Sequence, residues 1–284
     1  LPVGEMLRAL LEDYHPPLYY LLVHSWLKIS WPASQLVMVR VLSALFVLLS
    51  TLVLDRLWLR NLDRTTRLWF LALWTLSPCM VLYGRMARPY SLQVLLGVVA
   101  IYAGWRFLED PGSRKRFAAY VAAAACLLYV HYAPGLAVIA GISIGFLLKL
   151  ARGRDVRAFM VLVAANASIA AVYLPGWRHL AGSVQGSPDP DHLYRPLSST
   201  ILDHLVRTAY WFVSFTFGEN LPLWGVVLGG CLSPLVLWLA WKGLRRPPDW
   251  FWVAAAVTAV GYTGVSRWVS FPFVPARLLF LLPF

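Results

Sequence analysis

The sequence predicts an all-α protein, a polytopic bundle of transmembrane helices. Hydrophobic residues make up 60% of the 284 residues, and charged residues only 13%. Soluble domains are about half apolar and about a quarter charged. The apolar residues also form runs close to the length of about 20 residues that a helix needs to cross a bilayer. Composition and run length together exclude an ordinary soluble domain.

Two apolar segments, 16–30 and 201–217, are interpreted as amphipathic helices that lie on the membrane surface. The first is short and carries His24 and Lys28. A run of this length is more typical of an interfacial segment than of a span. The remaining apolar runs are the candidate spans: 36–55, 67–83, 89–108, 117–133, 134–149, 156–174, 221–241, 250–265 and a last run from 274.

Four short basic segments fall between alternate pairs of spans, within 56–67, 106–116, 149–157 and 242–246. Lys and Arg are enriched in the cytoplasmic loops of multispan proteins. If these four segments are cytoplasmic, the other connections must lie outside. The net charge of +12 then follows from topology, and we expect no nucleic-acid partner.

This topology divides the chain into four regions. Residues 1–35 are expected to form an extracytoplasmic juxtamembrane segment, and 36–175 the first group of transmembrane helices. Residues 176–220 form a long extracytoplasmic loop with an interfacial helix, and 221–284 the C-terminal transmembrane helices. The sequence starts with Leu1 and stops within an apolar run. We therefore expect a fragment that lacks sequence at both ends.

The predicted outer side receives most of the polar and aromatic residues that suit a binding site. Its segments include EDYHPPLYY (12–20), YGRMARPYS (83–91) and YVHYAPG (129–135). Pro16 and Pro17 suit the start of the surface helix, because the first backbone N–H groups of a helix have no partner there. A polar strip at the bilayer boundary indicates an outward-facing site.

Three motifs in this order resemble a known family of membrane enzymes. They are HPPLYYLL (15–22), ARPYSL (87–92) and HY (131–132). They resemble the polyprenyl-phosphate-sugar-dependent glycosyltransferases of the GT-C fold. Within these, they are most similar to glycosyltransferase family 39, with its protein mannosyltransferases and the lipid A aminoarabinose transferase. The run PARLLFLLPF (275–284) is similar to the arginine-led late span of that family, so the resemblance covers nearly the whole chain.

The resemblance implies transfer of a sugar from a polyprenyl-phosphate donor to an acceptor on the outer face of a bacterial cytoplasmic membrane. Arg85, Arg88 and Arg277 are the candidates for binding the donor phosphate, with His15 as a partner. An arginine suits this role because its rigid fork matches phosphate oxygens and it stays charged. The alternative is that arginines near span ends extend to the membrane surface without a ligand.

Five further residues are candidates for lining the path of the sugar or the lipid: Tyr19, Tyr20, Tyr90, His131 and Tyr132. For the first two, the alternative is an anchor in the aromatic belt of the interface. For His131 and Tyr132, the alternative is a structural role where two spans turn.

The catalytic base is not assigned. The family's acidic motif is expected upstream of residue 1, which leaves Asp13 as a candidate within the chain. Met86 stands where many relatives carry an acidic residue. No metal site and no cofactor are assigned. Asp189, Asp191 and His192 have ligand-type side chains in a Pro-rich loop, which leaves a divalent metal open.

Two other functions stay open: a transporter or flippase of a lipid-linked substrate, and a non-catalytic relative. Transporters place ionisable groups near the bilayer midplane, often between internal repeats. Here the polar groups gather at one face and no repeat is evident, which favours the enzyme. A non-catalytic relative stays open because the expected base is absent. The acceptor is unknown.

Overall fold

Every regular element in the part of the chain that the structure describes is a helix. The computed structural model describes residues 2–12, 15–29, 34–153, 156–177, 181, 213–217, 223–244, 253, 255–260, 279 and 281. The main elements are α1 (Val3–Glu12), α2 (Leu18–Trp26), α3 (Gln35–Val53) with a π-helical extension η1 (Leu54–Trp58), α4 (Arg64–Leu76), α5 (Pro78–Gly84), α6 (Tyr90–Glu109), α7 (Arg114–Val130), α8 (Tyr132–Gly153), α9 (Val156–Tyr173) with a 3₁₀ turn η2 (Leu174–Gly176), and α12 (Leu223–Leu244).

The predicted all-α bundle of membrane helices is confirmed. Three helices of the described part are long and apolar enough to cross a membrane: Gln35–Trp58, Tyr90–Glu109 and Val156–Gly176. A shorter apolar helix spans Tyr132–Leu148. Apolar side chains of α4 such as Trp69, 66% exposed, lie on the outer surface of the bundle, as expected of a helix that faces lipid.

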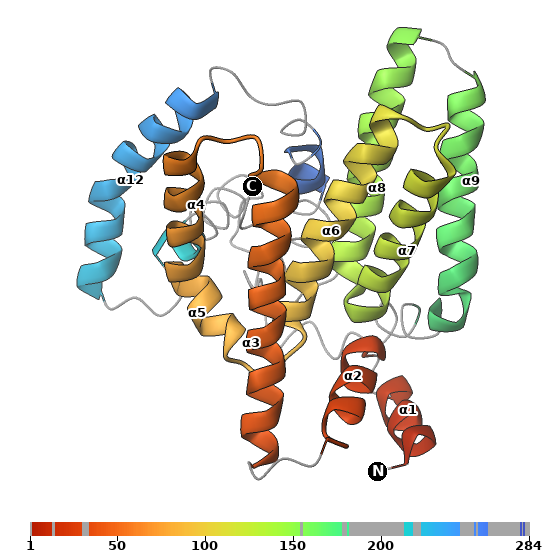
Figure 1. The fold of residues 1–284 in the computed structure, drawn as a ribbon, viewed down its shortest axis with the longest axis horizontal. Helices are drawn as coiled ribbons and strands as arrows, with labels where there is room; N and C mark the ends of the chain where they lie inside the picture. Colours follow the sequence, from red (N-terminus) through yellow and green to blue (C-terminus); the bar gives the residue numbers. More distant parts are fainter. Residues whose placement is uncertain are drawn as a thin grey trace, which may run out of the picture.

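The helix ends fall into two groups (Figure 1). At one end, η1 leads to α4, α6 leads to α7, and α8 and α9 approach one another. We call this the basic end, because residues 56–67 and 106–116 lie there. The opposite end carries α1, α2, the segment 85–89 between α5 and α6, and His131 between α7 and α8. We call this the juxtamembrane end.

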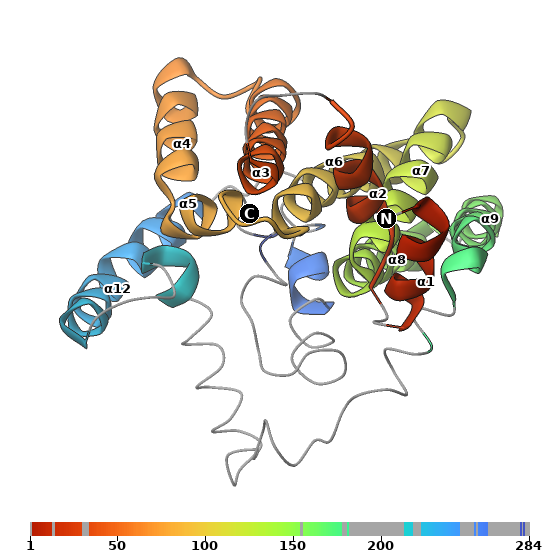
Figure 2. The same ribbon diagram turned by 90° about the horizontal axis from the view of Figure 1, so that it is seen from below.

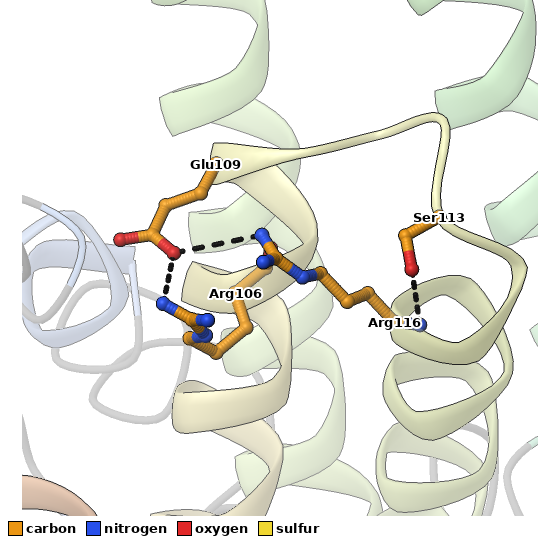
Figure 3. A network of polar contacts seen from close by, with 4 residues as sticks. All are labelled: Arg106, Glu109, Ser113 and Arg116. Atoms are coloured by element: carbon orange, nitrogen blue, oxygen red, sulfur yellow. Dashed lines mark hydrogen bonds and ion pairs between the residues drawn. The ribbon is translucent and has the colours of Figure 1, made fainter.

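Side-chain caps and ion pairs shape the turns of the basic end. Glu109 forms ion pairs with Arg106 and with Arg116, whose Nη1 lies 3.6 Å from Glu109 Oε2 (Figure 3). Arg116 also donates to the carbonyl of Arg106 at 3.0 Å. Exposed ion pairs of this kind contribute about 0–1 kcal/mol each. Their main consequence is therefore the geometry of the α6–α7 turn.

The first turns of α3, α4 and α7 are capped by Ser34, Asp63 and Ser113. Each side-chain oxygen accepts a backbone N–H that has no partner within the helix. Hydrogen bonds from Thr66 lower the pKa of the Asp63 carboxyl. Local sequence thus determines where these helices begin.

The predicted span 67–83 is wrong as a single helix. The structure has two helices there, α4 and α5, and Ser77 between them has an extended ψ of 127°. Pro78 occupies the first turn of α5. A proline lacks the N–H that a continuous helix needs, and its ring clashes with the preceding turn. The break turns the chain toward α3 before it reaches the juxtamembrane end.

Helix α6 is the centre of the bundle and packs against α3, α7 and α8. Val98, Ile101 and Phe107 on this helix are fully buried. At Gly104 an added Cβ would lie 2.5 Å from Cδ1 of Ile142 on α8. A small residue at this point lets two helices approach closely, as is common in membrane bundles.

We expect Gly104→Ala to lower the melting temperature of the protein relative to Gly145→Ala. Ile142 is fully buried, so its side chain must shift within a packed core, and overpacking of this kind costs about 1–3 kcal/mol. Gly145 also lies in a helix, but its added Cβ would meet only Leu108 Cδ1, at an ordinary 3.7 Å. Thermal unfolding in detergent micelles checks the pair, and equal melting temperatures would contradict the close packing of α6 on α8.

Candidate functional site

The short helix α2 anchors the juxtamembrane end to the bundle (Figures 1 and 2). It begins at Leu18, directly after Pro16 and Pro17, as the sequence predicts. It packs against α3 and α7, and the indole N–H of Trp26 donates to the carbonyl of Met38 at 2.8 Å. The buried cluster beneath it consists of Tyr19, Leu42, Phe46, Leu92 and Val130.

Three predicted residues of the HPPLYY motif lie together at the start of α2. The rings of His15 and Tyr20 are 6.0 Å apart and nearly perpendicular. The rings of Tyr19 and Tyr20 are 5.4 Å apart, again edge to face. Such contacts are favourable because the positive edge of one ring meets the negative face of the other. The motif therefore forms one aromatic unit.

Tyr19 connects this unit to the arginine segment. Its side chain is 3% exposed, and its hydroxyl lies beside the hydroxyl of Ser43 on α3. Burial raises the pKa of Tyr19, while the neighbouring Ser43 hydroxyl and the charge of Arg88 oppose that rise. Tyr19 therefore lies close both to Ser43, which bonds the segment 85–89, and to the charge of Arg88.

A partly buried hydrogen bond holds the segment 85–89 against α3. The hydroxyl of Ser43, which is fully buried, donates to the carbonyl of Met86 at 2.9 Å. Arg85 and Arg88 flank this anchor. Both line a cavity of about 460 Å³ at the juncture of α3 and the segment, and Arg40 of α3 lines it as well.

The cavity, which we call the arginine pocket, has a strongly positive lining. Its other lining residues are Leu36, Leu82, Met86 and Ala87. Among the described residues, no carboxylate forms an ion pair with Arg40, Arg85 or Arg88, whereas at the basic end Arg67, Arg106 and Arg116 have acidic partners. Guanidinium groups without acidic partners favour an anion, and their geometry matches phosphate or carboxylate oxygens.

Arg40 is not among the residues predicted from the sequence. The predicted site residues lie in the connections between spans or at the ends of spans. Arg40 instead lies in the second turn of α3, inside the predicted span 36–55. It is the only charged residue between 36 and 54. A lone cation within an apolar span is costly and usually marks a functional site, and that signal identifies it.

The other predicted residues are not shown to join the arginine pocket. Tyr90 packs edge to face on Tyr83, 5.0 Å away. His131 caps the end of α7 and its Nδ1 accepts the N–H of Ala133 at 3.4 Å. Its ring lies 5.3 Å from that of Tyr132. These contacts fit the structural alternative, with both residues at the turn between α7 and α8.

Asp13 and Arg277 lie outside the described residues, as does the segment that contains Asp189, Asp191 and His192. Within the described part of the chain, no group of three or more His, Cys, Asp or Glu side chains is arranged to hold a metal ion.

Comparison with known families decides the relationship. A model of the Alg9-like mannosyltransferase family matches residues 14–176 of the 284. The chain belongs to this family. The Alg9-like match includes the HPPLYY motif, the segment 85–89, α3 and both predicted aromatic positions at the α7–α8 turn. No curated protein and no solved structure gives a significant match.

Membership of the Alg9-like mannosyltransferases makes the protein a membrane glycosyltransferase of the GT-C type that uses a lipid-linked sugar donor. The predicted transferase class and the membrane location are confirmed at this level. The narrower resemblance to family 39 and its bacterial relatives is not confirmed by the match. The bacterial cytoplasmic membrane also stays a prediction.

Ser43→Ala is expected to lower the free energy of unfolding by about 1 kcal/mol, because it leaves the Met86 carbonyl without its buried donor. Ser25→Ala is the matched control, since the Ser25 hydroxyl is exposed and donates within its own helix to Leu21. Thermal unfolding of both variants in micelles measures the difference. If the two variants unfold at the same temperature, the Ser43 bond does not hold the segment.

Proposed function

We propose that the protein transfers a sugar from a polyprenyl-phosphate-linked donor to an acceptor on the outer face of the membrane. The arginine pocket is the observation that carries this proposal. A lipid-linked donor has an anionic phosphate at the bilayer boundary. Arg85 and Arg88, at the juxtamembrane end and without acidic partners among the described residues, offer that phosphate fixed positive charge.

The reaction breaks the bond between the sugar C1 and the phosphate oxygen, and forms a bond between C1 and an acceptor oxygen. The bonding electrons move to the lipid phosphate as it leaves, so negative charge grows on that group. Fixed cations that contact this group favour the transition state more than the ground state. Arg85 and Arg88 therefore bind the donor and help the lipid phosphate to leave.

His15 and Tyr19 of the HPPLYY motif are proposed as further contacts of the donor. The position of the Tyr19 hydroxyl beside Ser43 and near the charge of Arg88 supports a contact with the donor. His15 is held by Tyr20 and is the proposed additional donor to the phosphate. The acceptor proton goes to a carboxylate base, for which Asp13 stays a candidate, and Arg277 stays a candidate for the phosphate.

The proposed orientation has the basic end in the cytoplasm. Positively charged segments are retained there during insertion, and the residues of the basic end at 56–67 and 106–116 provide that signal. The juxtamembrane end then faces outward. This orientation gives the site access to donors and acceptors in the outer leaflet.

Arg88→Ala is expected to lower kcat/KM for sugar transfer by roughly 10²–10³, the usual effect of removing one donor that stabilises developing negative charge. The assay uses reconstituted protein, a panel of polyprenyl-phosphate sugars and a membrane extract as the acceptor. Arg114→Ala is the matched control, because Arg114 is exposed at the basic end. If Arg88→Ala inserts normally into the membrane and transfers sugar at an unchanged rate, Arg88 does not bind the donor phosphate. Movement of the donor across the bilayer without transfer would indicate a flippase.

A membrane-impermeant thiol reagent tests the orientation in intact cells. Lys28→Cys, exposed after α2, is expected to react from outside, and Gly112→Cys, exposed in the α6–α7 turn, only after permeabilisation. The background variant has Cys79, Cys126 and Cys231 replaced by Ser or Ala. The reverse labelling pattern would put the arginine pocket in the cytoplasm and contradict an outer-face reaction.

A further inference from the structure

A second cavity of about 460 Å³ adjoins the arginine pocket, and Arg40 and Arg85 line both. We call this second cavity the apolar groove. Helices α3 and α5 supply most of its lining, with Thr75 of α4 at its edge. Its apolar lining comes from Val37, Val41, Ala44, Val47, Met80 and Val81. A cavity of this size lies within the range of about 300–1,000 Å³ typical of ligand pockets.

The lining residues of α3 recur three or four positions apart, so they form one face of the helix. This face is open to the surroundings of the bundle, since Val37 is 47% exposed and Val41 is 44% exposed. Val81 on α5 is 54% exposed. In a membrane, these side chains face the hydrocarbon region. A ligand can therefore reach the apolar groove sideways from the bilayer.

The break between α4 and α5 shapes the groove. Because α5 leans toward α3, Gly84 lies so close to Val47 that an added Cβ would be 2.9 Å from its Cγ2. The missing side chain at Gly84 lets the two helices approach at the groove's inner wall. Arg85 follows directly, so the apolar wall leads without interruption into the positively charged pocket.

Arg40 lies where the two cavities meet. It is exposed, and among the described residues it has no acidic partner, although it lies within the span Gln35–Trp58. An arginine near the end of a span can extend to the membrane surface. That explanation does not account for the adjoining Arg85 and Arg88, which give the same location a threefold positive charge.

We infer that the apolar groove binds the isoprenoid chain of the lipid-linked donor, and that Arg40 is a third arginine at the donor phosphate. The complement of an apolar groove that ends in three arginines is an amphiphile with an anionic head. This inference rests on the proposed function, which supplies a donor with both parts. In addition, we infer that the isoprenoid chain runs along α3 and α5 toward the bilayer centre. Arg40 then sets the depth of the donor phosphate in the membrane.

Binding of undecaprenyl phosphate and of farnesyl phosphate to the full chain in nanodiscs tests the inference without requiring transfer. The long chain fills more of the groove, so it is expected to bind at least about tenfold more tightly than farnesyl phosphate. Ala44→Trp, which fills the groove from an exposed position, is expected to remove most of this difference. Leu49→Trp is the matched control, because Leu49 is 44% exposed on the same helix and lines neither cavity.

Arg40→Ala is expected to weaken both ligands by about tenfold or more, since both carry the phosphate. Arg40→Lys should restore part of the affinity, because it keeps the charge but loses the fork. Sugar transfer by the same variants is measured in parallel.

The outcomes separate the inference from the proposed function. Long-chain binding that Ala44→Trp leaves unchanged overturns the groove, even if transfer by the wild type is normal. Equal displacement of undecaprenyl phosphate by phosphatidic acid overturns the isoprenoid occupant and indicates a phospholipid. Binding that Ala44→Trp and Arg40→Ala both weaken, without transfer from any donor, supports the groove and contradicts the proposed function.

Discussion

The bilayer requires every backbone N–H and C=O group in its core to find a partner within the protein, and the fold depends on this requirement. Helices satisfy it within each segment. Departures from helix are tolerated only near the surface or where other groups replace the lost bonds. Among the described residues of 35–153, apart from the turns at 59–63 and 110–113 at the basic end, the departures occur at Ser77, at the segment 85–89 and at His131. The last two lie at the juxtamembrane end, and they carry or border the residues of the candidate site.

The two ends of the bundle treat positive charge differently. At the basic end, Arg67, Arg106 and Arg116 have carboxylate partners, whereas the exposed Arg60, Arg64 and Arg114 form no ion pair with a described residue. At the juxtamembrane end, Arg40, Arg85 and Arg88 share one pocket without such partners among the described residues. An arginine that is already paired with a carboxylate attracts an anionic ligand less strongly. The pocket arginines are therefore distinguished by lining one cavity together, and not by the lack of a partner alone.

One hydrogen bond links the fold to this pocket. Ser43 on α3 donates to Met86, which lies between Arg85 and Arg88. Tyr19 on α2 packs at the same place, above Leu42 and Phe46. Three stretches that are far apart in the sequence thus meet at a single point of α3. In this chain the HPPLYY motif and the segment 85–89 therefore meet at one part of α3 although they are far apart in the sequence.

The sequence by itself determined the helix class, most helix boundaries and the grouping of polar residues at one end. These features follow from local quantities: apolar run length, capping residues such as Ser34 and Asp63, and the position of basic segments. The motifs also led to the transferase class. They did so through residues 15–22 and 87–92, which lie inside the matched range 14–176.

Only the tertiary structure decided which residues share a site. The proline at 78 is a local signal for a break in the helix. The consequence of that break, the packing of α5 against α3, depends on the tertiary structure. Arg40 belongs to the arginine pocket because the second turn of α3 faces the segment 85–89, and no local pattern states that contact. Conversely, His131 and Tyr132 matched a motif, yet their described contacts lie at the α7–α8 turn. Packing between distant helices sets these distances, whereas sequence patterns report only the preferences of each helix alone.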